Sequence, residues 1–280
     1  MIAARPDPVA LAALVALAKD ALALRPGLVV LGLSGSQGSG KSTIAAALCH
    51  AMTARGIATA ALSLDDLYHT RAQRLRLAAD VHPLLITRGV PGTHDAALGL
   101  ATIAALARGE PACLPRFDKA HDDRRPDALA DRAPAQTRLL VFEGWCLGAR
   151  PQSAAALATP TNLLEAVEDA DGRWRAYANA ALAGDYAMLW AQIDVLAMLR
   201  APAFETVVRW RQDQEHALRQ VAGNAPGVMD PAAIARFVAH YERITRQLLV
   251  DLPDKADLVI NLDHHRRVTG MARRGPPAPG

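Results

Sequence analysis

The segment GSQGSGKS, which spans Gly35 to Ser42, constrains this chain more than any other part of its sequence. It fits the pattern G-x-x-x-x-G-K-[ST], in which glycines let backbone N–H groups turn inward around a phosphate. The preceding run LVVLGLSG predicts a buried strand over 28–35, and the breaker-free residues that follow predict a helix over 41–55. The N-terminus of such a helix adds partial positive charge. The pattern therefore predicts a phosphate-binding loop between a strand and a helix, in preference to a glycine-rich turn that binds nothing.

The rest of the chain continues this alternation of apolar runs and helical patterns. Further strands are predicted at 57–64, 138–144, 188–198 and 256–262, and further helices at 7–24, 96–107, 173–183, 204–221 and 231–249. Buried strands that alternate with helices predict an α/β fold with a mainly parallel five-stranded sheet and helices on both faces. The polar stretch 112–136 is predicted to be a long loop, and long loops in compact domains are often functional.

Composition narrows the class of protein. Of the 280 residues, 51% are hydrophobic, which supplies a core and excludes a disordered chain. The net charge of +3 is too small to indicate a nucleic-acid binder. No uncharged apolar run reaches the roughly 18 residues that a membrane span requires. We expect one domain over residues 1–269, with the N-terminal helix packed on it, and a disordered tail over 270–280.

Cysteine usage and the N-terminus bear on the compartment. The three cysteines, Cys49, Cys113 and Cys146, lie far apart and form no CxxC pair, which suits a reduced compartment. The apolar stretch near the N-terminus has some features of a signal peptide. Because Asp7 precedes it and Lys19 ends it, a surface helix is the preferred interpretation. We therefore expect a cytoplasmic protein.

The glycine-rich segment assigns roles to its own side chains. Lys41 is expected to reach the β- and γ-phosphates of a nucleotide and to assist phosphoryl transfer, and the Ser42 hydroxyl is expected to bind Mg²⁺. A GTPase is disfavoured because the nearest match to a guanine-reading N-K-x-D element, at 254–257, lacks Asn and precedes its strand. A basic run at 264–267 either borders the nucleotide base or is a solvated turn. The residues expected to bind ATP are Gly35, Ser36, Gln37, Gly38, Ser39, Gly40, Lys41, Ser42 and Thr43.

Acidic residues follow two of the predicted strands, at the edge where ligands bind in open α/β sheets. Asp65 is the candidate to orient an acceptor hydroxyl or to take its proton. Asp66 is a candidate substrate contact, because adjacent carboxylates seldom share one role, and either residue could instead cap the next helix. Glu143 fits the Walker B pattern and is expected to hold Mg²⁺ together with Ser42 and Asp65. The alternative for Glu143 is a structural acid paired with Lys41 or with a backbone amide.

Two polar segments supply candidate substrate contacts, RGVPGTHD at 88–95 and LPRFDKAHDDR at 114–124. Planar guanidinium groups suit a carboxylate clamp, although each basic residue could be a solvated surface charge, and Thr93 or Asp95 could cap a helix. On a later helix, Arg211 is a candidate lid residue over the nucleotide phosphates, unless it pairs with Glu215 four residues on. The candidate substrate contacts are Asp66, Tyr68, Arg88, Thr93, His94, Asp95, Arg116, Asp118, Lys119 and Arg124.

Six segments together resemble one protein family. In chain order they read GLSGSQGSGKST, SLDDLYHT, RGVPGTHD, LPRFDKAHDDR, VFEGWCLGA and WRQDQE…RFVAHYERIT. They resemble the D-glycerate 3-kinase group of plants and fungi and its bacterial relatives, a group similar to the uridine kinase, pantothenate kinase and phosphoribulokinase superfamily. The resemblance covers residues 28–268. It implies a P-loop NTPase fold of three α/β/α layers, with the third strand inserted beside the first and an inserted helical and looped substrate lid.

The resemblance also implies an activity, the ATP-dependent phosphorylation of D-glycerate to 3-phosphoglycerate with Mg²⁺. The S-x-D-x-F-Y segment of the superfamily carries its catalytic aspartate, and Asp65 falls on that position, with Leu67 in place of the usual Phe. Two alternatives stay open. One is a kinase for another hydroxyl acceptor, such as a nucleoside, a pantothenate-like compound or another hydroxy acid. The other is a non-enzymatic, ATP-dependent regulatory switch. The expected partner is a small hydroxy acid, without nucleic acid or membrane, and the chain is expected to be a monomer or a homodimer.

Overall fold

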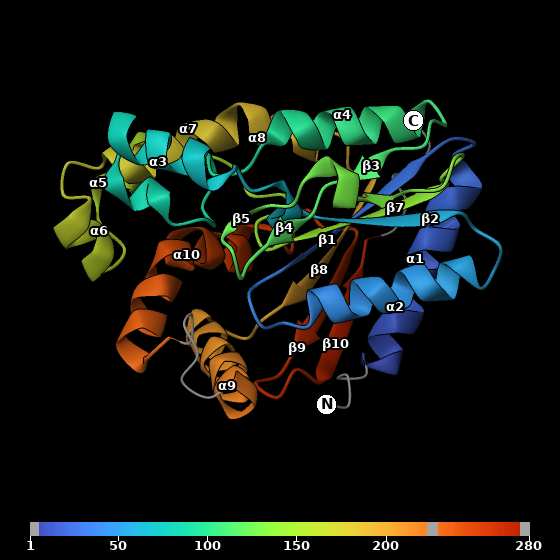
Figure 1. Cartoon of the computed structure of the whole chain (residues 1–280). Coiled ribbons are helices and arrows are strands. Elements are labelled where there is room, and N and C mark those ends of the chain that lie inside the picture. The colour runs from blue at the N-terminus through green and yellow to red at the C-terminus, as the bar shows by residue number, and fades with distance from the viewer. Residues whose placement is uncertain (1–5, 223–228, 275–280) are drawn as a thin grey trace.

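A computed structural model describes residues 6–222 and 229–274 of the chain (Figure 1). Within these residues, the central sheet has six strands in the order β10-β9-β8-β1-β7-β2. All neighbouring strands pair in parallel except β10, which pairs antiparallel with β9. The strands of this sheet are β1 (Val29–Gly35), β2 (Thr59–Ser63), β7 (Leu139–Gly144), β8 (Val195–Arg200), β9 (Leu258–Leu262) and β10 (Val268–Arg273).

Alternate residues of the central strands face opposite layers of helices. In β1, Val29 and Leu31 pack on the side of α1 and α2, whereas Val30 packs on the side of α4, α8 and α10. This follows from the two-residue period of a strand. The three-layer α/β/α fold is therefore confirmed, with β7 lying between β1 and β2 (Figure 1). The helices named here are α1 (Pro8–Leu24), α2 (Lys41–Thr53), α4 (Ala96–Ala107), α8 (Asp185–Trp190) and α10 (Pro231–Asp251).

Helices and loops are inserted between these strands. After β2 come the 3-10 helix η1 (Leu64–Leu67), α3 (Arg71–Asp80) and the 3-10 helix η2 (Pro83–Ile86). Figure 1 draws α3 close to α5 (Ala154–Ala158), α6 (Leu163–Glu168) and α7 (Arg173–Ala183), which follow β7, and α9 (Phe204–Ala222) follows β8. The predicted long loop at 112–136 contains two-residue strand pairs, which are β3 (Cys113–Leu114) with β6 (Asp131–Arg132) and β4 (Phe117–Asp118) with β5 (Asp123–Arg124).

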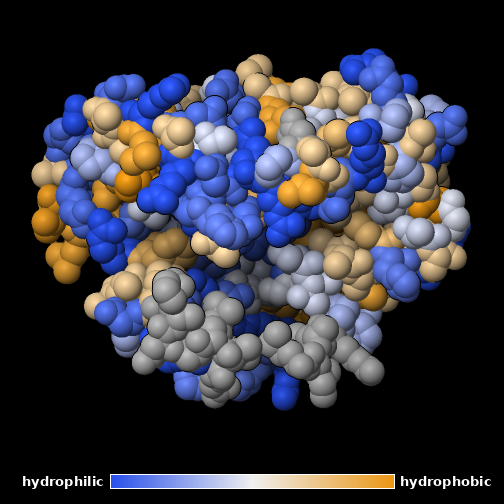
Figure 2. Space-filling model, viewed as in Figure 1, coloured by the Kyte–Doolittle hydropathy of each residue, from blue (hydrophilic) through white to orange (hydrophobic). Residues whose placement is uncertain are grey.

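The molecule is hollowed near the centre of the face drawn in Figure 2, where Figure 1 places the loop between β1 and α2. Hydrophilic residues form the upper rim of this hollow (Figure 2). Apolar side chains are exposed elsewhere, on α6, where Leu163 is 80% and Val167 is 74% exposed. Within the described residues, no helix has both the length and the apolar character needed to cross a bilayer.

The strand predicted at 188–198 is wrong in its first half. Residues 185–190 form α8, and the strand β8 begins only at Val195. Tyr186 and Leu189 of α8 are buried three residues apart, which is a helical spacing. A short apolar run is ambiguous by periodicity alone, and here packing against α4 and α7 selects the helix.

The sheet has one strand more than predicted. Residues 270–273 were expected to begin a disordered tail but belong to β10, and residues 275–280 lie outside the described residues. β10 is an edge strand with mostly exposed side chains, so it lacks the apolar alternation that marks a half-buried strand. Four helices, α3, α5, α6 and α8, were not predicted either.

Candidate active site

The loop between β1 and α2 has the backbone conformation that its glycines allow. Gly38 and Gly40 have φ angles of +76° and +86°, in the left-handed region. A Cβ atom on Gly38 would lie 2.6 Å from Cβ of Trp210, a buried residue of α9. Position 38 is therefore restricted to glycine both by its φ angle and by the close approach of α9.

Polar groups gather in this loop without partners. Ser36 Oγ, Gln37 Oε1 and Ser39 Oγ are buried and have no hydrogen-bond partner among the described residues. Unpartnered buried polar atoms cost free energy, so their concentration in one loop indicates a polar ligand. The N-cap residue of α2 is Gly40, which has no side chain to accept hydrogen bonds from the first turn. The N–H groups of that turn are therefore suited to bind an anion. The loop therefore fits the phosphates of a nucleotide.

Ser42 and Glu143 form the second part of the site. The Ser42 hydroxyl donates a hydrogen bond to Glu143 Oε1 at 2.9 Å. Glu143 is buried, and its Oε2 has no hydrogen-bond partner in the described part of the chain. Carboxylate and hydroxyl oxygens are the ligands that Mg²⁺ prefers. The pair could hold a divalent cation beside the phosphate loop. The hydrogen-bond partner of Glu143 is Ser42, whereas the structural alternative had Lys41 or a backbone amide as its partner.

Asp65 lies at the carboxyl edge of the sheet, close to this pair. Ser63 of β2 pairs with Glu143 of β7, so the two strands end together and η1 carries Asp65 just beyond that edge. Tyr68 donates its hydroxyl to Asp65 Oδ1 at 2.9 Å, and Lys119 Nζ lies 2.5 Å from Asp65 Oδ2. The Asp65 side chain is 28% exposed, and the two helices next to it are capped by other residues, η1 by Ser63 and α3 by Thr70.

Opposing effects act on the pKa of Asp65. Burial raises the pKa of this carboxyl. The positive charges of Lys119 and Lys41 and the Lys119 hydrogen bond lower it, and their combined effect is larger, so the pKa of Asp65 lies well below its usual range. Asp65 is therefore ionised at neutral pH. A weakly basic carboxylate is better suited to orient a hydroxyl than to remove its proton early in the reaction.

Asp66 takes a different part from its neighbour. Its Oδ1 accepts a hydrogen bond from the backbone N–H of Phe117 at 3.0 Å, and its Oδ2 accepts one from Arg116 at 3.1 Å. Burial raises the pKa of Asp66. Both oxygens thus fasten the long loop to η1, which favours a structural role for Asp66 and also for Arg116, whose guanidinium also pairs with Asp131.

Residues of the segment 88–95 divide between structural and site positions. Thr93 closes a turn, because its hydroxyl donates to Val90 O and accepts from Gly89 N. Asp95 caps α4 through the N–H of Leu98, as the alternative interpretation had it. His94 is 3% exposed, and its ring stacks on Tyr68 with centroids 4.4 Å apart.

Burial determines the charge of His94. Burial lowers the pKa of this imidazole to about 3, although the charge of Asp65 opposes that change. The ring is therefore neutral at physiological pH. His94 can act as a hydrogen-bonding group beside Asp65 without adding a positive charge to the site.

Most of the predicted basic side chains have acidic partners other than Asp65. Arg88 pairs with Asp122, and Arg124 pairs with Asp95 and donates to Tyr68 O. Asp118 accepts from Ala120 N and His121, so it shapes a local turn. Lys119 is 59% exposed and is the predicted basic residue that contacts Asp65 itself.

Sequence reasoning missed Arg74, which is 1% exposed on α3. Its guanidinium donates to the carbonyl groups of His69, Ile86 and Asp122 and pairs with the Asp122 carboxylate. Arg74 therefore joins α3, η2 and the long loop. No local signal marks it, because α3 is rich in arginine and the contacts come from segments up to 48 residues away.

Arg211 and the basic run at 264–267 lie at the other side of the phosphate loop. Arg211 pairs with Glu215 at 2.8 Å, the competing interpretation, so its lid role stays a prediction. Arg266 donates to Gly38 O at 2.6 Å, and its guanidinium lies 5.2 Å from the centroid of the Trp210 ring. The run was noted in the sequence, but the contact of Arg266 with the loop was not predicted.

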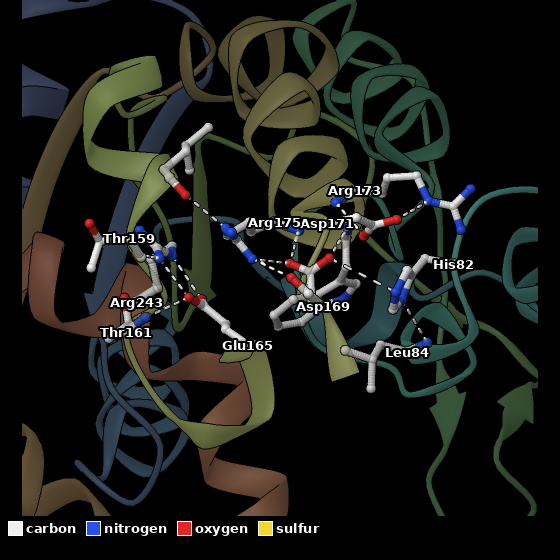
Figure 3. A network of polar contacts seen from close by, with 12 residues as sticks. His82, Leu84, Thr159, Thr161, Glu165, Asp169, Asp171, Arg173, Arg175 and Arg243 are labelled. Atoms are coloured by element: carbon white, nitrogen blue, oxygen red, sulfur yellow. Dashed lines mark hydrogen bonds and ion pairs between the residues drawn. The ribbon is translucent and has the colours of Figure 1, made fainter. Parts of the chain in front are cut away.

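A separate cluster of possible metal ligands lies in the helical region (Figure 3). The ligand atoms of His82, Asp169 and Asp171 lie within 4.8 Å of one another. However, Asp169 accepts from the backbone N–H of Arg175 and pairs with its guanidinium at 2.9 Å, and Asp171 pairs with Arg173. These contacts account for both carboxylates, so the cluster secures the start of α7.

No family model matches the chain. It is 35% identical over 227 residues to the uncharacterized kinase mug58 of Schizosaccharomyces pombe, across 76% of this chain and 78% of that protein. It is 28% identical over 255 residues to the chloroplastic D-glycerate 3-kinase of Arabidopsis thaliana, across 85% of this chain and about half, 53%, of that protein.

Solved structures show the same fold. The D-glycerate 3-kinase of Cryptococcus neoformans superposes with a TM-score of 0.81 and 24% identity, across 94% of this chain and 99% of that one. The YGR205w protein superposes with a TM-score of 0.74 and 23% identity, across 92% and 94%. At these identities the superpositions establish the P-loop kinase architecture, whereas the relation in sequence comes from the S. pombe kinase.

Proposed function

Because the chain belongs to the family of P-loop kinases that includes D-glycerate 3-kinase, we propose that it transfers the terminal phosphate of ATP to D-glycerate and forms 3-phosphoglycerate. The observation that carries the proposal is the position of Asp65. Its carboxylate lies beyond the adjoining ends of β2 and β7 and bonds Tyr68 and Lys119. An acceptor hydroxyl bound there would face the phosphate loop.

The loop from Gly35 to Thr43 binds the nucleotide phosphates in this proposal. Its backbone N–H groups and its unpartnered serine hydroxyls meet the phosphate oxygens, and Lys41 neutralises part of their charge. The Ser42 and Glu143 oxygens would hold Mg²⁺. Bound MgATP supplies the phosphoryl group in a form whose charge the cation already offsets.

Asp65 orients the acceptor in this proposal. Its low pKa keeps it ionised, so it accepts a hydrogen bond from the acceptor hydroxyl and takes the proton late, as phosphoryl transfer proceeds. Tyr68 fixes one carboxylate oxygen through its hydroxyl. Positioning of this kind supplies most of the rate enhancement in phosphoryl transfer.

The acceptor carboxylate binds basic side chains around Asp65. Lys119 is the most exposed of the candidates beside Asp65, and Arg88 and Arg124 lie in the same loop cluster with partly exposed side chains. An acceptor carboxylate that binds Lys119 would contact the same ammonium group that Asp65 contacts. Recognition of a hydroxy acid then rests on the long loop, which supplies Lys119.

The same proposal covers the setting of the enzyme. The free cysteines Cys49, Cys113 and Cys146 support a reduced compartment such as the cytoplasm. We infer one catalytic domain that extends through β10 to Arg273, and a monomer or a homodimer, because the phosphate loop, Glu143, Asp65 and Lys119 all come from one chain.

A coupled ADP-release assay tests the function. D-glycerate is expected to give the highest kcat/KM among D-glycerate, L-glycerate, pantothenate, uridine and ribulose 5-phosphate. A faster reaction with another alcohol would contradict the acceptor but not the kinase chemistry. Acceptor-independent ATP turnover, coupled to binding of another protein, would instead identify a regulatory switch.

The Asp65→Asn variant tests the site. Loss of the carboxylate is expected to lower kcat by about 10²- to 10⁴-fold, the usual effect of removing a group that handles the proton. ATP affinity, measured by calorimetry, is expected to stay nearly unchanged because Asp65 lies outside the phosphate loop. Asp80→Asn, at the exposed end of α3, is the matched control. Wild-type turnover in D65N would refute the assignment.

A further inference from the structure

His94 lies between two tyrosines in the buried part of the site. Its ring stacks on Tyr68 and meets the ring of Tyr186 edge-on, with centroids 5.7 Å apart. Tyr186 belongs to α8 and is 1% exposed. Tyr68 also donates its hydroxyl to Asp65. The Tyr68 ring therefore contacts His94 on its face and Asp65 through its hydroxyl.

The hydrogen bonds of Tyr186 have a direction that can be assigned. The backbone N–H of Gly92 donates to the Tyr186 oxygen at 3.0 Å, and His94 Nδ1 lies 2.5 Å from the same oxygen. If Nδ1 carried the proton, the oxygen would accept twice and its own buried hydrogen would lack an acceptor. The arrangement that satisfies every group has the Tyr186 hydroxyl donating to an unprotonated Nδ1.

This assignment fixes the other ring nitrogen. A neutral imidazole has one proton, so with Nδ1 as acceptor the proton is on Nε2. His94 Nε2 is buried and has no hydrogen-bond partner within the described residues. A buried N–H without an acceptor is unfavourable unless a ligand supplies one. His94 therefore offers one uncharged donor, Nε2–H, that has no acceptor in the described part of the chain.

We propose that Tyr186 is a positioning residue that holds His94 as the Nε2–H tautomer, so that His94 donates one hydrogen bond to a carboxylate oxygen of the acceptor. This inference rests on the proposed kinase function. It adds a source of specificity for hydroxy acids: a carboxylate oxygen satisfies the buried Nε2–H, whereas an acceptor without that oxygen leaves it unpaired. Tyr186 itself does not touch the substrate.

Nitrogen-15 NMR of histidine-labelled protein tests the tautomer without any acceptor. The nucleotide-free wild-type protein is expected to show His94 protonated at Nε2, with its signal assigned by comparison with His94→Gln. Tyr186→Phe is expected to abolish the single tautomer. A wild-type signal from the Nδ1–H tautomer would refute the inference, whichever acceptor the kinase uses.

Steady-state kinetics then test the role. Tyr186→Phe is expected to raise the KM of the acceptor about tenfold, with a smaller change in kcat and none in the KM of ATP, as for loss of one hydrogen bond. In a His94→Gln background the same change should have no further effect on that KM. Tyr177→Phe, beside Gly92, is the matched control.

The outcomes separate the two proposals. Additive effects of the two substitutions, or an unchanged KM in Y186F, would refute the positioning role. If D-glycerate is not the acceptor, the tautomer measurement still decides the first step, and the KM test applies to the acceptor that the screen identifies.

Discussion

Lys119 and Asp65 form the contact with the clearest chemical consequence at the scale of single residues. They lie 54 residues apart in the chain and meet at 2.5 Å. Burial acts to raise the pKa of Asp65, and the Lys119 ammonium, with Lys41, reverses that effect. The ionisation state of the Asp65 carboxylate therefore depends on a residue of the long loop.

Replacing Lys119 should change the pH dependence of the enzyme. In Lys119→Met the pKa of Asp65 rises, because burial remains while the largest compensating charge is lost. The acidic limb of the kcat/KM profile should then move to higher pH, since a larger fraction of Asp65 is protonated in weak acid. The profile is measured by ADP release between about pH 5 and pH 8, a range in which an unperturbed carboxyl stays ionised.

The control for this prediction is Arg125→Met, which removes one positive charge from the same loop at an exposed position. Its acidic limb should match that of the wild-type enzyme. An unchanged limb in K119M would show that Lys119 does not set the protonation of Asp65.

At the scale of elements, Arg74 determines how α3, η2 and the long loop assemble. Its guanidinium is nearly inaccessible and bonds three backbone carbonyl groups and one carboxylate. Arg74→Met removes this donor from the three carbonyl groups, and the Asp122 carboxylate keeps only its Arg88 partner among the described residues, so the free energy of unfolding should fall by about 3 kcal/mol. Chemical denaturation measures this change.

Arg76→Met is the control on the same helix, because Arg76 is exposed. It should change the free energy of unfolding by no more than about 0.5 kcal/mol. Equal stabilities for R74M and R76M would contradict the role assigned to Arg74.

The elements themselves differ in how far the sequence predicts them. The strand over 29–35 and the helix that begins at Lys41 were predicted closely, because a buried strand, a glycine loop and a helix follow one another without interruption. The run at 188–198 was misassigned, because α8 and β8 are both apolar and only residues 191–194 separate them. β10 has no apolar pattern of its own and forms by pairing with β9.

At the scale of the whole molecule, Arg266 joins the turn between β9 and β10 to the phosphate loop, 228 residues away. It donates to Gly38 O at 2.6 Å and lies over the ring of Trp210. The turn between the last two strands, β9 and β10, thus supports the phosphate loop.

Arg266→Met should therefore weaken nucleotide binding. Loss of a charge-assisted hydrogen bond to the loop is expected to raise the KM of ATP by about tenfold. The KM of the acceptor should stay unchanged, because Arg266 contacts neither Asp65 nor its partners. Arg267→Met, at the exposed neighbouring position, is the control in the same two-substrate assay. A selective rise in the acceptor KM would contradict this role.

The sequence by itself determined the phosphate loop, the α/β architecture and the strand ends that carry Asp65 and Glu143. These features depend on contiguous residues, whose backbone preferences and apolar periodicity act over short distances. Only the tertiary structure decided that Asp66 fastens a loop, that Lys119 contacts Asp65, and that Arg74 and Tyr186 are buried. Those pairings join segments far apart in the chain, and the partner of each charge depends on how the loops pack, which no local pattern encodes.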